Sequence, residues 1–363
     1  MDVTKTKPAG DLLSTKKHYE ILDGVRGVAA IAVVIFHFME IAISEPSKNF
    51  IAHAYLAVDL FFCLSGFVIA YAYDNRIQKI GTATFFKLRL IRLHPLVVVG
   101  SIIGLLTFIF DPYSSLYLKY ADRIVYLFVT SCFMIPYPIV PERFFNLFHL
   151  NPPTWSLFWE YVINIVYAFV LIKIRNKTLW IITILAAILL CYESHKAGSL
   201  IVGWSRDTFP GGGVRVCYSF IAGILVYRSK YIISSKLGFL PIALLSFFMF
   251  LVPYNNQYNW LVDPFIVIFC FPLLVALGAG ARLRPFFSKL CKFSGDISYP
   301  LYMVHYPVIW IFLSYVEKEK PSMHQMLPII IIGTILLIVF AYIIMRVIDI
   351  PVRNYLKSRL KKL

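Results

Sequence analysis

Long apolar segments constrain the fold of this chain more than any other feature of its sequence. The chain has 363 residues, of which 59% are hydrophobic and 15% are charged, whereas soluble domains carry about 25% charged residues. A helix needs about 20 mostly apolar residues to cross a bilayer. We therefore expect an all-α polytopic membrane protein with about ten transmembrane helices. The candidate segments lie near residues 25–44, 54–73, 94–111, 155–173, 178–194, 213–228, 237–253, 260–280, 297–316 and 327–348.

A further apolar segment, residues 124–140, is short and contains Pro136 and Pro138. If it does not cross, the Lys- and Arg-rich connections lie on the same side as the basic N-terminus, as the positive-inside pattern requires. We therefore expect both termini in the cytoplasm and residues 124–140 as a re-entrant or interfacial element. Residues 1–19 are then a cytoplasmic tail, and residues 20–363 form one membrane domain. The net charge of +16 has the same explanation, so it does not indicate nucleic-acid binding.

Two ionisable residues share one face of the first span. On an α-helix, the step from Arg26 to His37 is roughly 16 Å along the axis and about 20° away from whole turns. Arg26 would then lie at the inner interface and His37 in the outer half of the span. Ionisable groups inside a membrane are costly and are often functional. An arginine that snorkels to the headgroups and a histidine that binds a neighbouring helix would explain the pair equally well.

Further polar residues lie in or beside the next two spans. Asp59 is expected either to pair with a nearby arginine or to contact a substrate. Ser65 and Gly66 could allow close packing of helices. Arg89 and Arg92, three residues apart on one helix face, are explained most simply by the positive-inside pattern. They could also form a phosphate clamp at the cytoplasmic mouth.

Two later segments add a carboxylate and a second membrane histidine. The carboxylate could orient a histidine or form a structural hydrogen bond, and the second histidine could brace two helices or take part in catalysis. The sequence has no metal-ligand spacing, P-loop, nucleophile elbow or dinucleotide fingerprint, so we expect no bound metal. The residues concerned are Trp155, Ser156 and Glu160 in the first segment, and Ser298, Tyr302 and His305 in the second.

Taken together, these motifs resemble those of the acyltransferase 3 family, in the same order and over nearly the whole chain. Members of that family are ten-helix membrane enzymes that move acyl groups, usually acetyl, from cytoplasmic acyl-CoA to sugars or other acceptors. One departure is Asp349, which stands where a glutamate is usual. The matching elements are Arg26-x10-His37, the segment 58–67, Arg89-x-x-Arg92, Trp155-Ser156-Leu157 with Glu160, and the late motif Gly295-x-x-Ser298-Tyr299-x-x-Tyr302 followed by His305.

The resemblance implies an O-acyltransferase in a bacterial inner membrane. Its donor would be acyl-CoA, most simply acetyl-CoA, and its acceptor a hydroxyl group of a cell-surface sugar, an exopolysaccharide or a lipid-linked glycan. The alternative is a proton-coupled secondary transporter, in which intramembrane His, Glu and Asp side chains relay protons. Such transporters contain inverted repeats with broken helices, and no such symmetry is visible in this sequence.

The same resemblance assigns roles to the polar residues. His37 is the expected general base, because imidazole titrates near pH 6.5 and can accept a hydroxyl proton at neutral pH. An acyl-histidine intermediate is the less favoured mechanism. The predicted site comprises His37, Glu160 and His305 as catalytic residues, Arg26, Arg89 and Arg92 as ligands of the CoA phosphates, and Asp59, Ser65, Trp155, Ser156, Ser298 and Tyr302 as substrate contacts.

Overall fold

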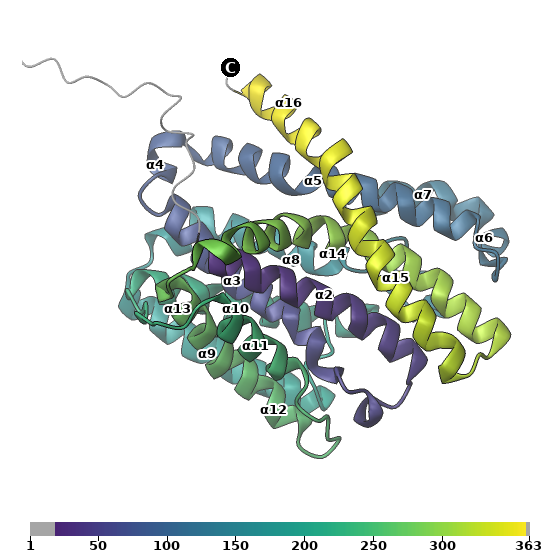
Figure 1. Cartoon of the computed structure of the whole chain (residues 1–363). Coiled ribbons are helices and arrows are strands. Elements are labelled where there is room, and N and C mark those ends of the chain that lie inside the picture. The colour runs from purple at the N-terminus through teal and green to yellow at the C-terminus, as the bar shows by residue number, and fades with distance from the viewer. Residues whose placement is uncertain (1–18, 361–363) are drawn as a thin grey trace, which may run out of the picture.

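The computed structural model describes residues 19–360. The predicted tail, apart from Tyr19, and the last three residues of the chain lie outside this part. Within it the regular structure is helical, with only two isolated β-bridges. Figure 1 shows the helices packed side by side in one bundle, with α2 and α3 inside and α15 on its surface. The prediction of an all-α polytopic membrane protein is confirmed.

Ten helical segments of the structure match the ten predicted spans. They are α2 (Glu20–Ala42), α3 (Ala57–Tyr73), α5 (Thr82–Ile109), α8 (Thr154–Phe169), α9 (Asn176–Ala197), α10 (Phe209–Arg228), α11 (Phe239–Phe250), α12 with α13 (Asn259–Phe265 and Phe271–Gly280), α14 (Pro285–Glu319), and α15 with α16 (Met323–Ile344 and Ile350–Leu360). Seven are long and apolar enough to cross a membrane. The exceptions are α8, α11 and α14, so the number ten and the side of the termini remain predictions.

Small residues let two pairs of helices approach closely at the centre of the bundle. The first pair is α2 and α14, where Gly27 lies against Ser294. The second pair is α3 and α10, where Gly66 lies against the backbone of Phe220. A side chain on either glycine would overlap its neighbour, as is typical of membrane helix interfaces. The close packing expected beside Ser65 is therefore present.

The segment between α5 and α8 does not form a full span. Its main helix, α7 (Ile124–Cys132), has nine residues and is about 13 Å long, which is less than half of the hydrocarbon thickness. It follows the short α6 (Leu116–Lys119) and packs against α5. After Cys132 the chain continues to residue 140 without regular structure. This agrees with the expectation that residues 124–140 do not cross.

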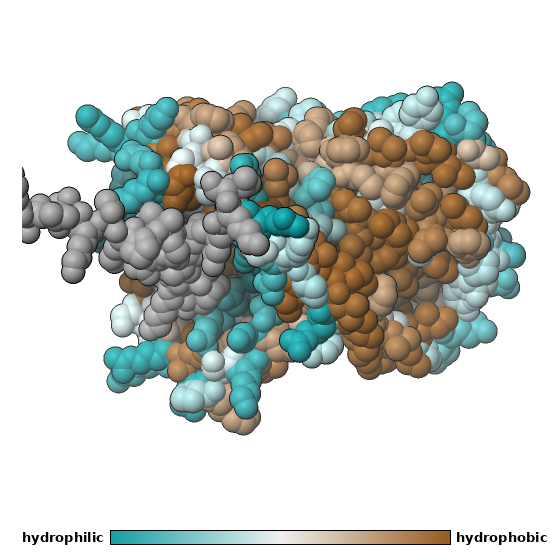
Figure 2. Space-filling model, turned by 90° about the horizontal axis from the view of Figure 1, so that it is seen from above, coloured by the Kyte–Doolittle hydropathy of each residue, from teal (hydrophilic) through white to brown (hydrophobic). Residues whose placement is uncertain are grey.

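The outer surface of the bundle carries many exposed apolar side chains. On α15, for example, Ile331, Ile332, Ile335 and Leu336 are all more than half exposed. Figure 2 shows one face of the molecule, where a broad apolar area lies between hydrophilic side chains at the two ends of the view. Large exposed apolar areas are rare on soluble proteins, and here they match a surface that faces lipid.

Candidate active site

Two histidines stack on each other at the interface of α2 and α14. The ring centroids of His37 and His305 are 5.3 Å apart, with an angle of 24° between the ring planes. His305 is completely buried, whereas 20% of the His37 side chain is exposed. The structure therefore brings together the two histidines that the sequence separates by more than half of the chain.

A carboxylate from the same helix holds the His37 ring. The Nδ1 atom of His37 lies 2.5 Å from Oε1 of Glu40. Because an ionised carboxylate only accepts hydrogen bonds, Nδ1 carries the hydrogen and Nε2 is left as a basic nitrogen. The sequence analysis allowed Glu160 to orient a histidine or to form a structural hydrogen bond, but the carboxylate that contacts His37 is Glu40. The i, i+3 spacing of His37 and Glu40 was the signal that could have indicated it.

The second histidine is fixed by backbone groups. Nδ1 of His305 lies 3.1 Å from the carbonyl oxygen of Leu301 and 2.9 Å from that of Tyr302. Since both partners are acceptors, Nδ1 is the protonated nitrogen. Nε2 of His305 is buried and has no hydrogen-bond partner among the described residues. Beside it, the hydroxyl groups of Tyr302 and Ser156 lie 2.8 Å apart.

The predicted arginines gather where α2 begins, and we refer to Arg26, Arg89 and Arg92 as the arginine cluster. Arg92 lies close enough to both Arg26 and Arg89 to interact with them electrostatically. Arg26 forms an ion pair with Asp23 at 3.0 Å and donates to the Ser298 hydroxyl at 3.0 Å. Because α2 is one continuous helix, Arg26 of this cluster and His37 are separated by roughly 16 Å along its axis.

Glu160 belongs to this arginine cluster and not to the histidine pair. Its Oε1 atom accepts hydrogen bonds from Arg89 at 2.8 Å, from Ser65 at 2.5 Å and from Asn164 at 3.2 Å. These contacts join α5, α3 and α8 at one point. Glu160 therefore holds Arg89 in place, and it makes no contact with His37 or His305 that could orient either ring.

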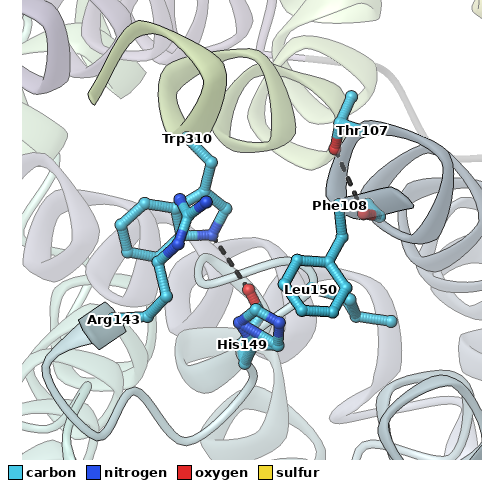
Figure 3. A pocket seen from close by; sticks show the side chains of 7 residues that line it. Thr107, Phe108, Arg143, His149, Leu150 and Trp310 are labelled. Atoms are coloured by element: carbon cyan, nitrogen blue, oxygen red, sulfur yellow. Dashed lines mark hydrogen bonds between the residues drawn. The ribbon is translucent and has the colours of Figure 1, made fainter. Parts of the chain in front are cut away.

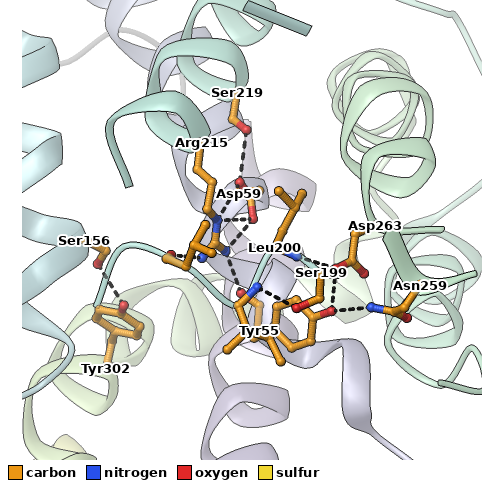
Figure 4. Close-up of polar contacts among 12 residues, drawn as sticks. Tyr55, Asp59, Ser156, Ser199, Leu200, Arg215, Ser219, Asn259, Asp263 and Tyr302 are labelled. Carbon is orange, nitrogen blue, oxygen red and sulfur yellow. Dashed lines mark hydrogen bonds and ion pairs between the residues drawn. The ribbon is translucent and has the colours of Figure 1, made fainter. Parts of the chain in front are cut away.

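Asp59 lies in a different environment, a buried network drawn in Figure 4. Its Oδ2 atom is 2.6 Å from Nη2 of Arg215, and the two side chains are 0% and 2% exposed. Arg215 also donates to the carbonyl oxygens of Val202 and Tyr55, at 2.9 and 3.1 Å, and lies over the Trp155 ring at 5.2 Å. Of the two interpretations that the sequence allowed for Asp59, the arginine partner is present in the structure.

A second carboxylate extends this network toward α12. The Asp263 side chain accepts hydrogen bonds from the Tyr55 hydroxyl at 2.6 Å and from the Leu200 backbone N–H at 2.7 Å. Asn259 donates to the same Tyr55 hydroxyl at 3.0 Å and contacts Nε2 of His53 at 2.7 Å. All four side chains are nearly or fully buried. No motif in the sequence indicated these partners.

Figure 3 shows a pocket between α5, α14 and the segment that contains Arg143 and His149. The Arg143 guanidinium stacks on Trp310 at 4.3 Å, and the Trp310 ring contacts Tyr306, which contacts His37. Nη1 of Arg143 and both ring nitrogens of His149 are buried without a partner among the described residues. The sequence gave no signal for this pocket. It is lined by Gly104, Thr107, Phe108, Arg143, His149, Leu150 and Trp310.

Comparison with known proteins identifies the family of this chain. A family model described as an acyltransferase domain matches residues 19–346, which is most of the chain. The chain belongs to the acyltransferase 3 family. The chain is 26% identical in sequence to O-acetyltransferase OatA of Staphylococcus aureus, and the alignment covers 92% of this chain and 57% of that protein. The matched region thus spans little more than half of that relative.

Two further relatives fit the same assignment. Protein 2 in the picA locus of Rhizobium radiobacter is 37% identical over 43% of this chain and 83% of its own length. A putative O-acetyltransferase of Staphylococcus aureus strain COL is 25% identical over 92% of this chain and 57% of its own length. No solved structure matches significantly. The chain therefore contains the acyltransferase domain of this family, and its apolar helices fit a multi-pass membrane protein.

Proposed function

We propose that this protein transfers an acetyl group from acetyl-CoA to a hydroxyl group of a cell-surface sugar or of a lipid-linked glycan. One observation carries the proposal: Arg26 of the arginine cluster and His37 of the histidine pair lie on the same helix, roughly 16 Å apart. This separation is comparable to the length of the pantetheine arm of CoA. The name of the relative OatA, an O-acetyltransferase, supports the same chemistry.

At one end of this path the arginines bind the CoA phosphates. Guanidinium groups match phosphate geometry and stay charged at every physiological pH. Arg26 and Arg89 are held by Asp23 and Glu160, whereas Arg92 forms no ion pair with any carboxylate of the described residues. This unbalanced positive charge favours an anionic ligand. The thioester of a donor held here reaches the histidine pair.

At the other end His37 acts as the general base. Its Nε2 atom accepts the proton of the acceptor hydroxyl while the oxygen attacks the thioester carbonyl carbon. The C–S bond then breaks, and the leaving CoA sulfur takes the proton from the imidazolium. Glu40 keeps the ring oriented and stabilises its charged form. His305 stacks on the His37 ring, and we assign it the role of positioning the reacting groups.

The acceptor approaches from the side of the Arg143, His149 and Trp310 pocket. Its buried nitrogens without partners suit hydroxyl groups, because guanidinium donates while a neutral imidazole both donates and accepts. In this proposal the arginine cluster lies on the cytoplasmic side, where acyl-CoA is made, and the basic connections support that orientation. We assign the protein to a bacterial inner membrane, since its relatives are bacterial proteins.

The test uses the purified chain in detergent with acetyl-CoA and a series of soluble sugars, and measures release of the CoA thiol. His37→Ala should lower turnover by about 10²- to 10⁴-fold, as expected for a lost general base. CoA binding should persist in this variant. His324→Ala, at an exposed position on α15, is the matched control and should keep the normal rate.

Two results would contradict the proposal. Normal turnover of His37→Ala would exclude this residue as the base. If the normal chain released no thiol with any acceptor but took up a solute when a pH gradient was imposed on proteoliposomes, the transporter function would replace the acyltransferase proposal.

A further inference from the structure

Arg353 is a fourth arginine beside the arginine cluster, although it comes from the last helix of the chain. It lies on α16, beyond the residues that match the family model, which end at 346. The sequence suggests only that it belongs to a basic C-terminal tail. In the structure α16 packs against α5, the helix of Arg89 and Arg92, and Figure 1 shows these helices crossing.

The contacts of Arg353 differ from those of a solvated tail residue. Its side chain is only 15% exposed and forms an ion pair with Asp349 at 2.8 Å. Its Nε atom and Oδ1 of Asp349 are buried without a hydrogen-bond partner among the described residues. Buried polar atoms are usually satisfied, so an unused donor at such a place indicates a missing partner.

The surroundings identify the charge of that partner. Arg92 interacts electrostatically with Arg353, Arg26 and Arg89, and with one carboxylate, Asp349, whose effect is smaller than that of Arg353 or Arg26. Asp349 also interacts with Lys357 and with the exposed Asp296. The cations in this region therefore outnumber the carboxylates, and the carboxylates Asp23, Glu160 and Asp349 are each already paired with another arginine.

A local distortion of the helix sets the position of this pair. Between α15 and α16 the chain forms one π-helical turn, Met345–Asp349, and Asp349 is its last residue. Such turns are rare and are frequently found at functional sites. The extra residue in the turn changes the helix face that α16 presents to α5, where Arg353 lies within electrostatic range of Arg92.

We propose that Arg353 binds a phosphate group of CoA together with Arg26, Arg89 and Arg92, so that α16 closes the donor site. This inference rests on the proposed use of acyl-CoA. Arg26, Arg89 and Arg353 all lie within electrostatic range of Arg92, and the free Nε–H of Arg353 donates to a phosphate oxygen. Arg359, on the same helix, is exposed and contacts Tyr355, and it has no such role.

Calorimetry with CoA and with pantetheine, which lacks the phosphates, tests this proposal on the full chain in detergent. Arg353→Gln should weaken CoA binding about 10-fold or more, as a lost hydrogen bond to a charged group would, and should leave pantetheine binding unchanged. Arg353→Lys should recover part of the affinity. Arg359→Gln is the matched control and should bind CoA normally.

Hydrogen exchange of the unmodified chain gives a second measure that does not depend on folding of a variant. The amides of residues 350–360 should exchange more slowly with CoA present. Unchanged CoA affinity of folded Arg353→Gln, or unchanged exchange of α16, would overturn this inference while leaving the proposed function intact. If the unmodified chain bound no CoA, both would fail.

Discussion

The arginine cluster and the Asp59–Arg215 network both place charges within the bundle, but they satisfy those charges differently. Arg215 has a carboxylate partner, two backbone carbonyl partners and an aromatic ring, and it is 2% exposed. Arg92 has no ion-pair partner among the described residues and lies among other arginines. A completed buried pair stabilises the fold, whereas incompletely paired cations are available to a ligand.

The histidines of the two regions also differ in how many of their ring nitrogens form hydrogen bonds. His53 in the network uses both ring nitrogens, one with Asn259 and the other with the backbone of Val252. His37 and His305 each use only Nδ1. The second ring nitrogen distinguishes a histidine that holds structure from one that can take a proton.

The largest expected effect falls on the completed network. Arg215→Ala leaves the Asp59 carboxylate buried without its partner, which should destabilise the protein by about 3–5 kcal/mol. Thermal unfolding in detergent measures the loss. Replacing both residues, with Asp59→Leu and Arg215→Met, should destabilise it less than Arg215→Ala alone. Equal stability of Arg215→Ala and the unmodified chain would show that the Asp59–Arg215 ion pair does not stabilise the fold.

An intermediate effect is expected in the arginine cluster, on binding more than on stability. Arg89→Ala should raise the dissociation constant for acyl-CoA by roughly 10- to 100-fold, because one charged hydrogen bond to phosphate is lost. Equilibrium binding together with protein yield separates the two effects. Arg175→Ala, at an exposed position, is the control. Normal acyl-CoA affinity of a well-folded Arg89→Ala variant would show that Arg89 does not bind the donor and serves only to orient the chain in the membrane.

The smallest effect is expected at His305. His305→Ala should lower turnover by about 10-fold, much less than His37→Ala, because a positioning residue contributes less than the base itself. The two variants are compared by steady-state thiol release at saturating acetyl-CoA. If His305→Ala lost turnover and His37→Ala kept it, His305 would be the base and His37 its support.

Some features of the site could be predicted from local sequence. The eleven-residue step from Arg26 to His37 gave their shared helix face and their separation, because the geometry of one helix is fixed by its hydrogen bonds. Glu160 was identified as a site residue both from its position as a carboxylate within an apolar span and from its place in the family motif. The sequence could not assign it to Arg89 in place of a histidine, because that contact joins α8 to α5.

The sequence by itself determined the helices, the apolar surface toward lipid and the family, since each depends on residues close together in the chain or on ordered motifs. Only the tertiary structure decided which charges are paired. Asp59 meets Arg215 across 156 residues, and Arg26 meets Ser298 across 272. Such contacts depend on which helices pack together and on their rotation, and an apolar span carries almost no local signal for either.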